Sequence, residues 1–243
     1  MQLVYLGLTV LLATFLQTSI GFGFAVFAMA IFPLIYPYGT AIALMQAIGL
    51  ANTFFLTVRF HRSIRWRTML PLLIPTLAFG LLFTFVSFSM DTRLLRIALG
   101  CVLALLSLYF FRFAATVSIQ PTLSNGVAMG VVSGISNGLF GIGGPPAALY
   151  LLPAIGEKTA YLATIQAYFT LCNITNLGLR IAKGALVEGY LVDILIGWIA
   201  ALVGTLCGLW AFSRVNQNAL KRIVYAFIGL NGLWVVVQEI FLV

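Results

Sequence analysis

Apolar residues run through this chain in long stretches that polar residues interrupt only briefly. The clearest of them are residues 70–90, 94–111, 191–212 and 223–237, where charged side chains are nearly absent. About 20 apolar residues in a helix are enough to cross the hydrocarbon core of a bilayer. The pattern therefore predicts an all-α, polytopic membrane protein with about eight membrane segments.

The pattern also repeats within the chain. A Gly-x-Gly, a proline and a glutamine recur 120 residues apart, at Gly21 and Gly141 (141 − 21), Gly23 and Gly143, Pro33 and Pro153, and Gln46 and Gln166. Gln17 and Asn137 extend the match upstream. We therefore expect two homologous halves, with residues 1–112 as the first repeat, 113–122 as a linker and 123–243 as the second repeat.

Each half opens with an apolar segment, residues 3–35 or 123–155, that is too long for one membrane span and too short for two. We expect a Gly-broken or re-entrant helix in each, interrupted at Gly21/Gly23 and at 141–146, with both ends returning to one membrane face. Three ordinary membrane helices follow in each half, at residues 40–58, 70–90, 94–111, 159–179, 191–212 and 220–239.

The basic residues indicate how the halves are oriented. If every segment were a plain span, the halves would be parallel and the 13 Lys and Arg would divide seven against six between the two faces. If the broken segments return to their own face, the division becomes nine against four. The four are Arg93, Arg96, Arg180 and Lys183. Because cytoplasmic loops carry an excess of Lys and Arg, inverted repeats are favoured.

Composition agrees with a membrane protein. The chain is 62% hydrophobic and 7% charged, with a mean hydropathy of +1.11. The net charge of +8 is scattered between apolar stretches, which argues for contact with lipid headgroups and against nucleic acid. The N-terminus lacks the positive region of a signal peptide, so we expect it to stay as the first segment of a multi-pass protein of the cell inner membrane.

The chemistry of the breaks favours anions. A new helix start leaves backbone N–H groups without partners and carries the positive end of the helix dipole. Lipid cannot satisfy these groups, so they must face protein or a cavity. The candidate binding residues at the breaks are Gly21, Gly23, Phe24, Gly141, Gly143, Gly144 and Pro145. The alternative is that the glycines only allow close helix packing.

Amide side chains near the breaks give a second group of candidates. Gln46 and Gln166 lie one helix after each break, and Asn137 precedes the second. Asn173 and Asn176 follow Gln166 on one helical face. They either line the site as neutral donors or join neighbouring helices by hydrogen bonds.

Charged residues are scarce inside the apolar segments. All five acidic residues lie near predicted segment ends, so no carboxylate relay for a proton or sodium is evident. Arg59 and Arg180 lie at nearly matching helix ends. They either attract anions at the two mouths or, as we favour, are interfacial arginines that extend toward the headgroups.

Around Gly138-Leu139-Phe140-Gly141-Ile142-Gly143-Gly144-Pro145, with its weaker echo Gly21-Phe22-Gly23-Phe24, the sequence resembles the TauE/SafE sulfite-exporter family over nearly its whole length. The resemblance implies transport of sulfite or of sulfonates such as sulfoacetate. The first copy has Phe24 and Ala25 where the second has Gly144 and Pro145. We therefore expect the first break to be weaker.

Together these patterns predict an anion transporter that works by alternating access, with a passive anion channel as the alternative, and the resemblance implies small sulfur-containing anions as its substrates. Its expected partners are the anion, the bilayer, a coupling proton or other ion, and a second copy in a homo-oligomer. No cofactor is expected: Cys101, Cys172 and Cys207 lack metal-ligand spacing. The sole histidine, His61, lies in an Arg-rich loop, which argues against an intramembrane enzyme.

Overall fold

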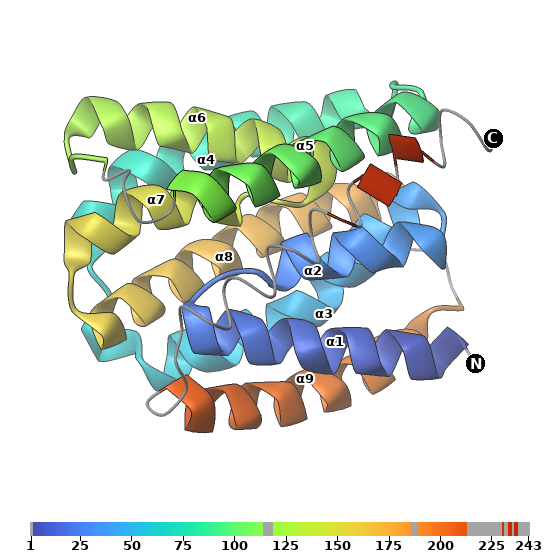
Figure 1. Ribbon diagram of the computed structural model, residues 1–243, viewed down its shortest axis with the longest axis horizontal. Helices are drawn as coiled ribbons and strands as arrows, with labels where there is room; N and C mark the ends of the chain where they lie inside the picture. Colours follow the sequence, from blue (N-terminus) through green and yellow to red (C-terminus); the bar gives the residue numbers. More distant parts are fainter. Residues whose placement is uncertain are drawn as a thin grey trace.

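The computed structural model describes residues 2–113, 119–185 and 189–212, with positions 230, 233, 234, 236 and 237. These residues are helical with short connections, and the described part contains no strand (Figure 1). The α-helices are α1 (Gln2–Ile20), α2 (Phe24–Ile31), α3 (Tyr38–Arg59), α4 (Trp66–Ser87), α5 (Thr92–Phe113), α6 (Leu123–Phe140), α7 (Gly144–Ile155), α8 (Lys158–Ala182) and α9 (Leu191–Phe212). Two short 3-10 helices are η1 (Phe32–Leu34) and η2 (His61–Ser63). The predicted span at 220–239 lies almost wholly outside the described residues.

Both predicted breaks are present. α1 ends at Ile20 and α2 begins at Phe24, while α6 ends at Phe140 and α7 begins at Gly144. The expectation of a weaker first break is wrong, because each break removes three residues from helix. In the first break Gly21 and Gly23 both have positive φ, 99° and 121°. Residues with a side chain rarely adopt such backbone angles, so these two glycines interrupt the helix without a proline.

The two parts of each broken helix form a hairpin. In Figure 1, α2 turns back toward the side of the molecule where the N-terminus lies, and α7 turns back toward the side where α6 begins. α1 contacts α2, and α6 contacts α7. The expectation that each segment returns to its own face agrees with this path.

The two halves are packed into one another rather than side by side. α1 packs along α9 and α6 packs along α4, while α3 and α8 lie together in the centre (Figure 1). α1 in the first half corresponds to α6 in the second, and α4 corresponds to α9. Exchanging the two halves therefore converts the α1–α9 pair into the α6–α4 pair. This packing is what two related halves with a shared core would produce, and the repeat boundaries themselves stay a prediction.

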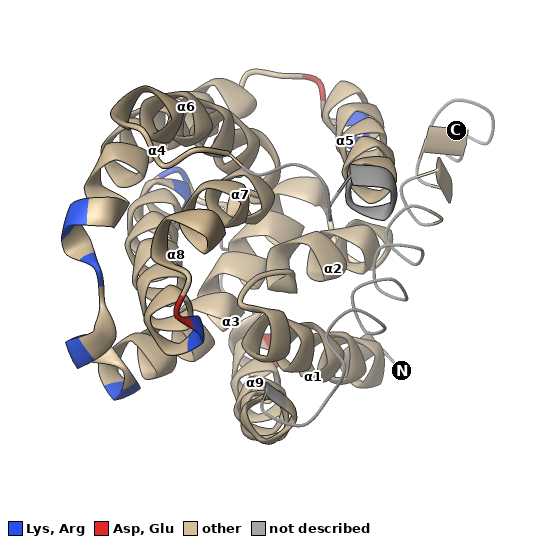
Figure 2. Ribbon diagram, turned by 60° about the vertical axis from the view of Figure 1, so that its left-hand side comes forward, with Lys and Arg blue, Asp and Glu red and all other residues tan. Residues whose placement is uncertain are grey.

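Contacts at the helix ends show how α3 and α8 run. The Arg65 guanidinium, at the end of the short connection between α3 and α4, lies 3.9 Å from the Glu157 carboxylate, just before α8. The backbone N–H of Arg65 donates to Thr164 Oγ1 of α8. Figure 2 shows basic residues on the α3–α4 connection at the end where α8 begins. α3 therefore ends where α8 starts, so the two helices are antiparallel, and this favours inverted halves over parallel ones.

Five described helices are long and apolar enough to cross a membrane: Gln2–Ile20, Tyr38–Arg59, Trp66–Ser87, Thr92–Tyr109 and Leu191–Ala211. α6 and α8 are not among them. α8 carries Gln166 and Asn176, which are almost fully buried, so its polar side chains face protein rather than lipid. Its lower hydropathy therefore reflects a place in the centre of the bundle.

Candidate functional site

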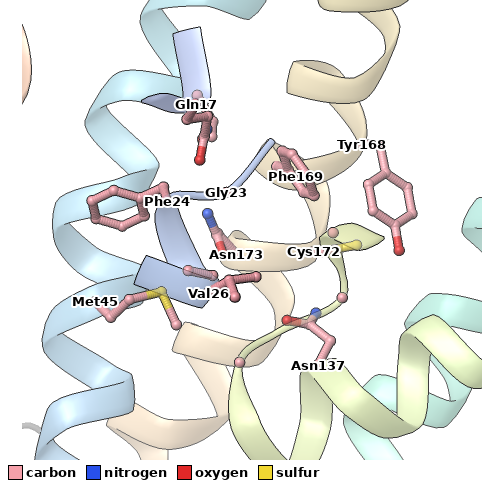
Figure 3. A pocket seen from close by; sticks show the side chains of 15 residues that line it. Gln17, Gly23, Phe24, Val26, Met45, Asn137, Tyr168, Phe169, Cys172 and Asn173 are labelled. Carbon is pink, nitrogen blue, oxygen red and sulfur yellow. The ribbon is translucent and has the colours of Figure 1, made fainter. Parts of the chain in front are cut away.

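A pocket lies between the two breaks (Figure 3). The empty space between its lining atoms, the open solvent at its mouth included, is about 460 Å³. Its lining residues are Gln17, Gly23, Phe24, Ala25, Val26, Met45, Thr53, Asn137, Gly141, Gly143, Gly144, Tyr168, Phe169, Cys172 and Asn173.

The lining comes from corresponding positions of both halves. At the offset of 120 residues, four pairs line the pocket together: Gln17 and Asn137 (137 − 17), Gly23 and Gly143, Phe24 and Gly144, and Thr53 and Asn173. The two breaks also touch, because a Cβ on Gly144 would lie 3.7 Å from Cβ of Phe22. The pocket is therefore shared between the repeats rather than belonging to one of them.

The predicted site residues divide into two groups. Those that line the pocket are Gly23, Phe24, Asn137, Gly141, Gly143, Gly144 and Asn173. Those outside the lining are Gly21, Gln46, Pro145, Gln166 and Asn176. Gln17 and Phe169 line the pocket without having been predicted, although the offset of 120 residues points from Asn137 directly to Gln17.

The backbone donors at the two helix starts are unequal. In α2 the first intrahelical hydrogen bond runs from the N–H of Phe27 to the carbonyl of Gly23, at 2.9 Å. The N–H groups of the three residues between them therefore have no partner within α2. In α7 the second and third residues are Pro145 and Pro146, which have no N–H. The start of α2 thus offers more donors than the start of α7.

Gln166 stabilises the first break. Its Nε2 donates to the carbonyl of Gly21 at 3.1 Å, and its Oε1 accepts from Nε2 of Gln17 at 2.9 Å. A break leaves carbonyls without helical partners, so a buried amide that reaches one replaces the lost bond. In this conformation the Gln166 side chain is occupied by protein, whereas Gln17 borders the pocket.

Gln46, the counterpart of Gln166 in α3, has no such role. It is fully buried, and neither its Nε2 nor its Oε1 has a hydrogen-bond partner among the described residues. The second break is held instead by Ser133, whose Oγ donates to the carbonyl of Gly143. Ser133 Oγ also lies 2.5 Å from the hydroxyl of Tyr168, which donates to Thr76 Oγ1 at 3.2 Å. The sequence alone gave no sign of this network.

Arg180 lies inside the protein, so the expectation that it extends to the headgroups is wrong. Only 2% of its surface is exposed, and its Nη2 donates to the carbonyl of Gly138 at 2.7 Å. The hydroxyl of Tyr38 donates to the next carbonyl, that of Leu139, at 2.9 Å. A cation at a helix C-terminus is favourable, so Arg180 caps α6 directly before the break. Arg59 is exposed, as expected.

The lining of the pocket carries no charged side chain among the described residues. Its polar groups are the amides Gln17, Asn137 and Asn173, the hydroxyls Thr53 and Tyr168, and the Cys172 thiol. Within the described part of the chain, no group of three His, Cys, Asp or Glu is close enough to hold a metal ion. The arrangement offers neutral hydrogen-bond donors to a small polar solute.

Long apolar helices, two of them broken around an internal pocket, define a polytopic membrane protein with an architecture that transporters use. The profile of the sulfite exporter TauE/SafE family matches residues 6–235. The chain therefore belongs to this family of transporters, as the motif around Gly141 and Gly143 indicated. Comparison with curated proteins and with solved structures gives no match.

Proposed function

We propose that this chain transports small sulfur-containing anions, sulfite or sulfonates such as sulfoacetate, across the cell inner membrane by alternating access. The observation that carries the proposal is the pocket lined by both breaks at corresponding positions. In transporters built from inverted repeats, the substrate site lies where the broken helices of the two repeats meet. Membership of a sulfite-exporter family supports the sulfur oxyanion as substrate.

The chemistry of the lining suits a solute that must bind and leave. The N–H groups at the start of α2 and the amides of Gln17, Asn137 and Asn173 can donate to oxyanion oxygens. Since the described residues of the lining include no Lys or Arg, the anion would meet partial charges rather than a full charge there. Transport requires binding that is strong enough for the solute to enter and weak enough for its release.

The proposal is tested with purified protein in liposomes. We expect saturable uptake of labelled sulfite that unlabelled sulfite inside the vesicles accelerates, because a carrier returns faster when it is loaded. A channel would give uptake without this acceleration, and the absence of sulfite flux would reject the proposed substrate.

A blocking variant connects the flux to the pocket. Ala25→Trp places a large ring in the lining and should abolish uptake. The matched control is Leu105→Trp on α5, where the native side chain is 65% exposed, and it should transport normally. Normal uptake by a folded Ala25→Trp protein would exclude this pocket as the route.

A further inference from the structure

The central helices α3 and α8 carry a glutamine at corresponding positions, Gln46 and Gln166 (166 − 46). Both side chains are 0% exposed, and a buried amide is unfavourable unless it finds hydrogen-bond partners within the protein. Gln166 has two partners, the carbonyl of Gly21 and the amide of Gln17. Gln46 has none within the described part of the chain. The two equivalent amides are therefore in opposite states.

Gln46 lies on the side of α3 that faces the second break. The hydroxyl of Tyr38, at the start of α3, donates to the carbonyl of Leu139 at 2.9 Å. One turn further along α3, Cγ2 of Ile42 would lie 3.2 Å from a Cβ added to Gly141. Residues four apart share one helix face, so Tyr38, Ile42 and Gln46 form a row in which the first two already contact this break. Gln46 is the next residue of that row.

The groups that Gln166 uses in the first half have counterparts in the second. Gly21 corresponds to Gly141 (141 − 21), and Gln17 corresponds to Asn137 (137 − 17). Gln17 and Asn137 both line the pocket, and Figure 3 shows them on opposite sides of it. The second break therefore offers Gln46 the same two kinds of partner, a backbone carbonyl and a side-chain amide.

We propose that Gln46 and Gln166 are alternating latches of the transport cycle, each of which holds the break of the other half in one of the two access states. In the described conformation Gln166 holds the first break and Gln46 is unpaired. In the opposite-facing conformation Gln46 bonds to the carbonyl of Gly141 and to Asn137, and Gln166 releases Gly21. This inference rests on the alternating access proposed above and names the residues that balance its two states.

Inverted repeats explain how the two states can balance. When two related halves exchange roles, the contacts of one half are rebuilt in the other. Each state then has one paired and one unpaired glutamine, so the latches favour neither state strongly, and a carrier can occupy both. If Gln46 served packing alone, a leucine or methionine would fill its place without leaving an amide unpaired.

Cys172 reports access to the pocket. Its thiol borders the pocket, and with Cys101 and Cys207 replaced by alanine it is the single cysteine of the chain. The rate at which it reacts with a small membrane-impermeant methanethiosulfonate is measured in spheroplasts and in inverted vesicles. The quotient of the two rates, compared with that of the same background with both glutamines present, is the access ratio. No substrate is needed, so the latches are tested apart from the identity of the anion.

The two latches should move the access ratio in opposite directions. Gln46→Leu removes the latch of the opposite-facing state, and Gln166→Leu removes the latch of the described state, so each should shift the ratio by about fivefold or more. The double variant should return close to the starting ratio, because neither state then has a latch. The matched control is Thr9→Val in α1, a buried position whose hydroxyl bonds to the carbonyl of Tyr5 in its own helix; it should leave the ratio unchanged.

Gel filtration in detergent establishes that each variant is folded. Shifts in the same direction for the two folded single variants, or an unchanged ratio in folded Gln46→Leu, would overturn the latches, whether or not sulfite is transported. If Gln166→Leu does not fold, Gln46→Leu decides alone, since it loses no hydrogen bond of the described conformation. Opposite shifts in a protein that carries no sulfite would support the latches and reject only the proposed substrate.

Discussion

Gln46 and Gln166 occupy corresponding positions in α3 and α8, yet their amides have different surroundings. Gln166 bonds to Gly21 and Gln17, whereas Gln46 has no partner among the described residues. A buried amide without a hydrogen-bond partner is unfavourable by about 1–3 kcal/mol. Removing a buried amide that has partners leaves those partners unsatisfied. The same substitution at the two sites should therefore have opposite effects.

We expect Gln46→Leu to raise the free energy of unfolding by about 1 kcal/mol, and Gln166→Leu to lower it by about 1–3 kcal/mol because the carbonyl of Gly21 and the amide of Gln17 lose their partner. Thermal unfolding of the two variants in detergent measures both effects. Destabilisation of equal size in both would show that Gln46 is paired in solution.

The two arginines at matching helix ends give a second comparison between the halves. Arg180 is buried and donates to Gly138, while Arg59 is exposed. Arg180→Met should destabilise the protein by about 1.5–3 kcal/mol, the contribution of a hydrogen bond to a charged group. Arg59→Met should change stability by less than about 0.5 kcal/mol. Equal unfolding temperatures for the two variants would argue against a capping role for Arg180.

The residues that sequence reasoning missed share a physical cause. The glycines of the breaks were predictable because their backbone requirement is local and recurs at a fixed offset. For Gln166 the sequence left two roles open, and for Ser133 and Arg180 it missed the role, because each depends on which helix packs against which, and the spacing of a residue in its own helix does not contain that information. The pocket ring Phe169 was missed for the same reason, since a phenylalanine in an apolar helix carries no distinguishing signal.

The pairing of α4 and α6 depends on close backbone approach. Without a hydrophobic force between helices in lipid, small residues that bring backbones together stabilise such pairs. α6 presents glycines to α4 at every fourth position: a Cβ on Gly130 would lie 2.5 Å from the carbonyl oxygen of Leu72, and one on Gly138 would lie 2.7 Å from that of Gly80. α6 therefore has the composition of a packing helix.

Gly134 tests this pairing. A Cβ there would lie 2.8 Å from Cβ of Phe79 and 2.9 Å from the carbonyl oxygen of Thr76, so Gly134→Ala should destabilise the protein by about 1–3 kcal/mol through overpacking. The matched control is Gly178→Ala in α8, where the added Cβ meets nothing within 4 Å and alanine favours helix. Thermal unfolding of both variants measures the difference. A neutral Gly134→Ala would show that α4 and α6 are looser than described.

At the scale of the molecule, the sequence favoured inverted halves from charge balance alone, and the structure adds an independent argument. The ion pair between Arg65 and Glu157 places the end of α3 with the start of α8. Lys183, just after α8, lies at the other end, with its Nζ 4.8 Å from the ring centroid of Phe85 near the end of α4. Parallel halves would put Arg65 and Glu157 on opposite membrane faces, where no ion pair can form.

Inverted halves predict the side of the membrane from which each loop can be labelled. In a background with the three native cysteines replaced, Arg62→Cys and Lys158→Cys should react with an impermeant maleimide from one side of the membrane, and Lys183→Cys from the other. The native side chains of Arg62, Lys158 and Lys183 are all exposed. Because the loop of Arg62 is rich in arginine, the shared side should be the cytoplasm, so inverted vesicles should label the first two and intact spheroplasts the third. Labelling of Arg62→Cys and Lys158→Cys from opposite sides of the membrane would require parallel halves. Parallel halves could not present their two breaks to one pocket from opposite directions.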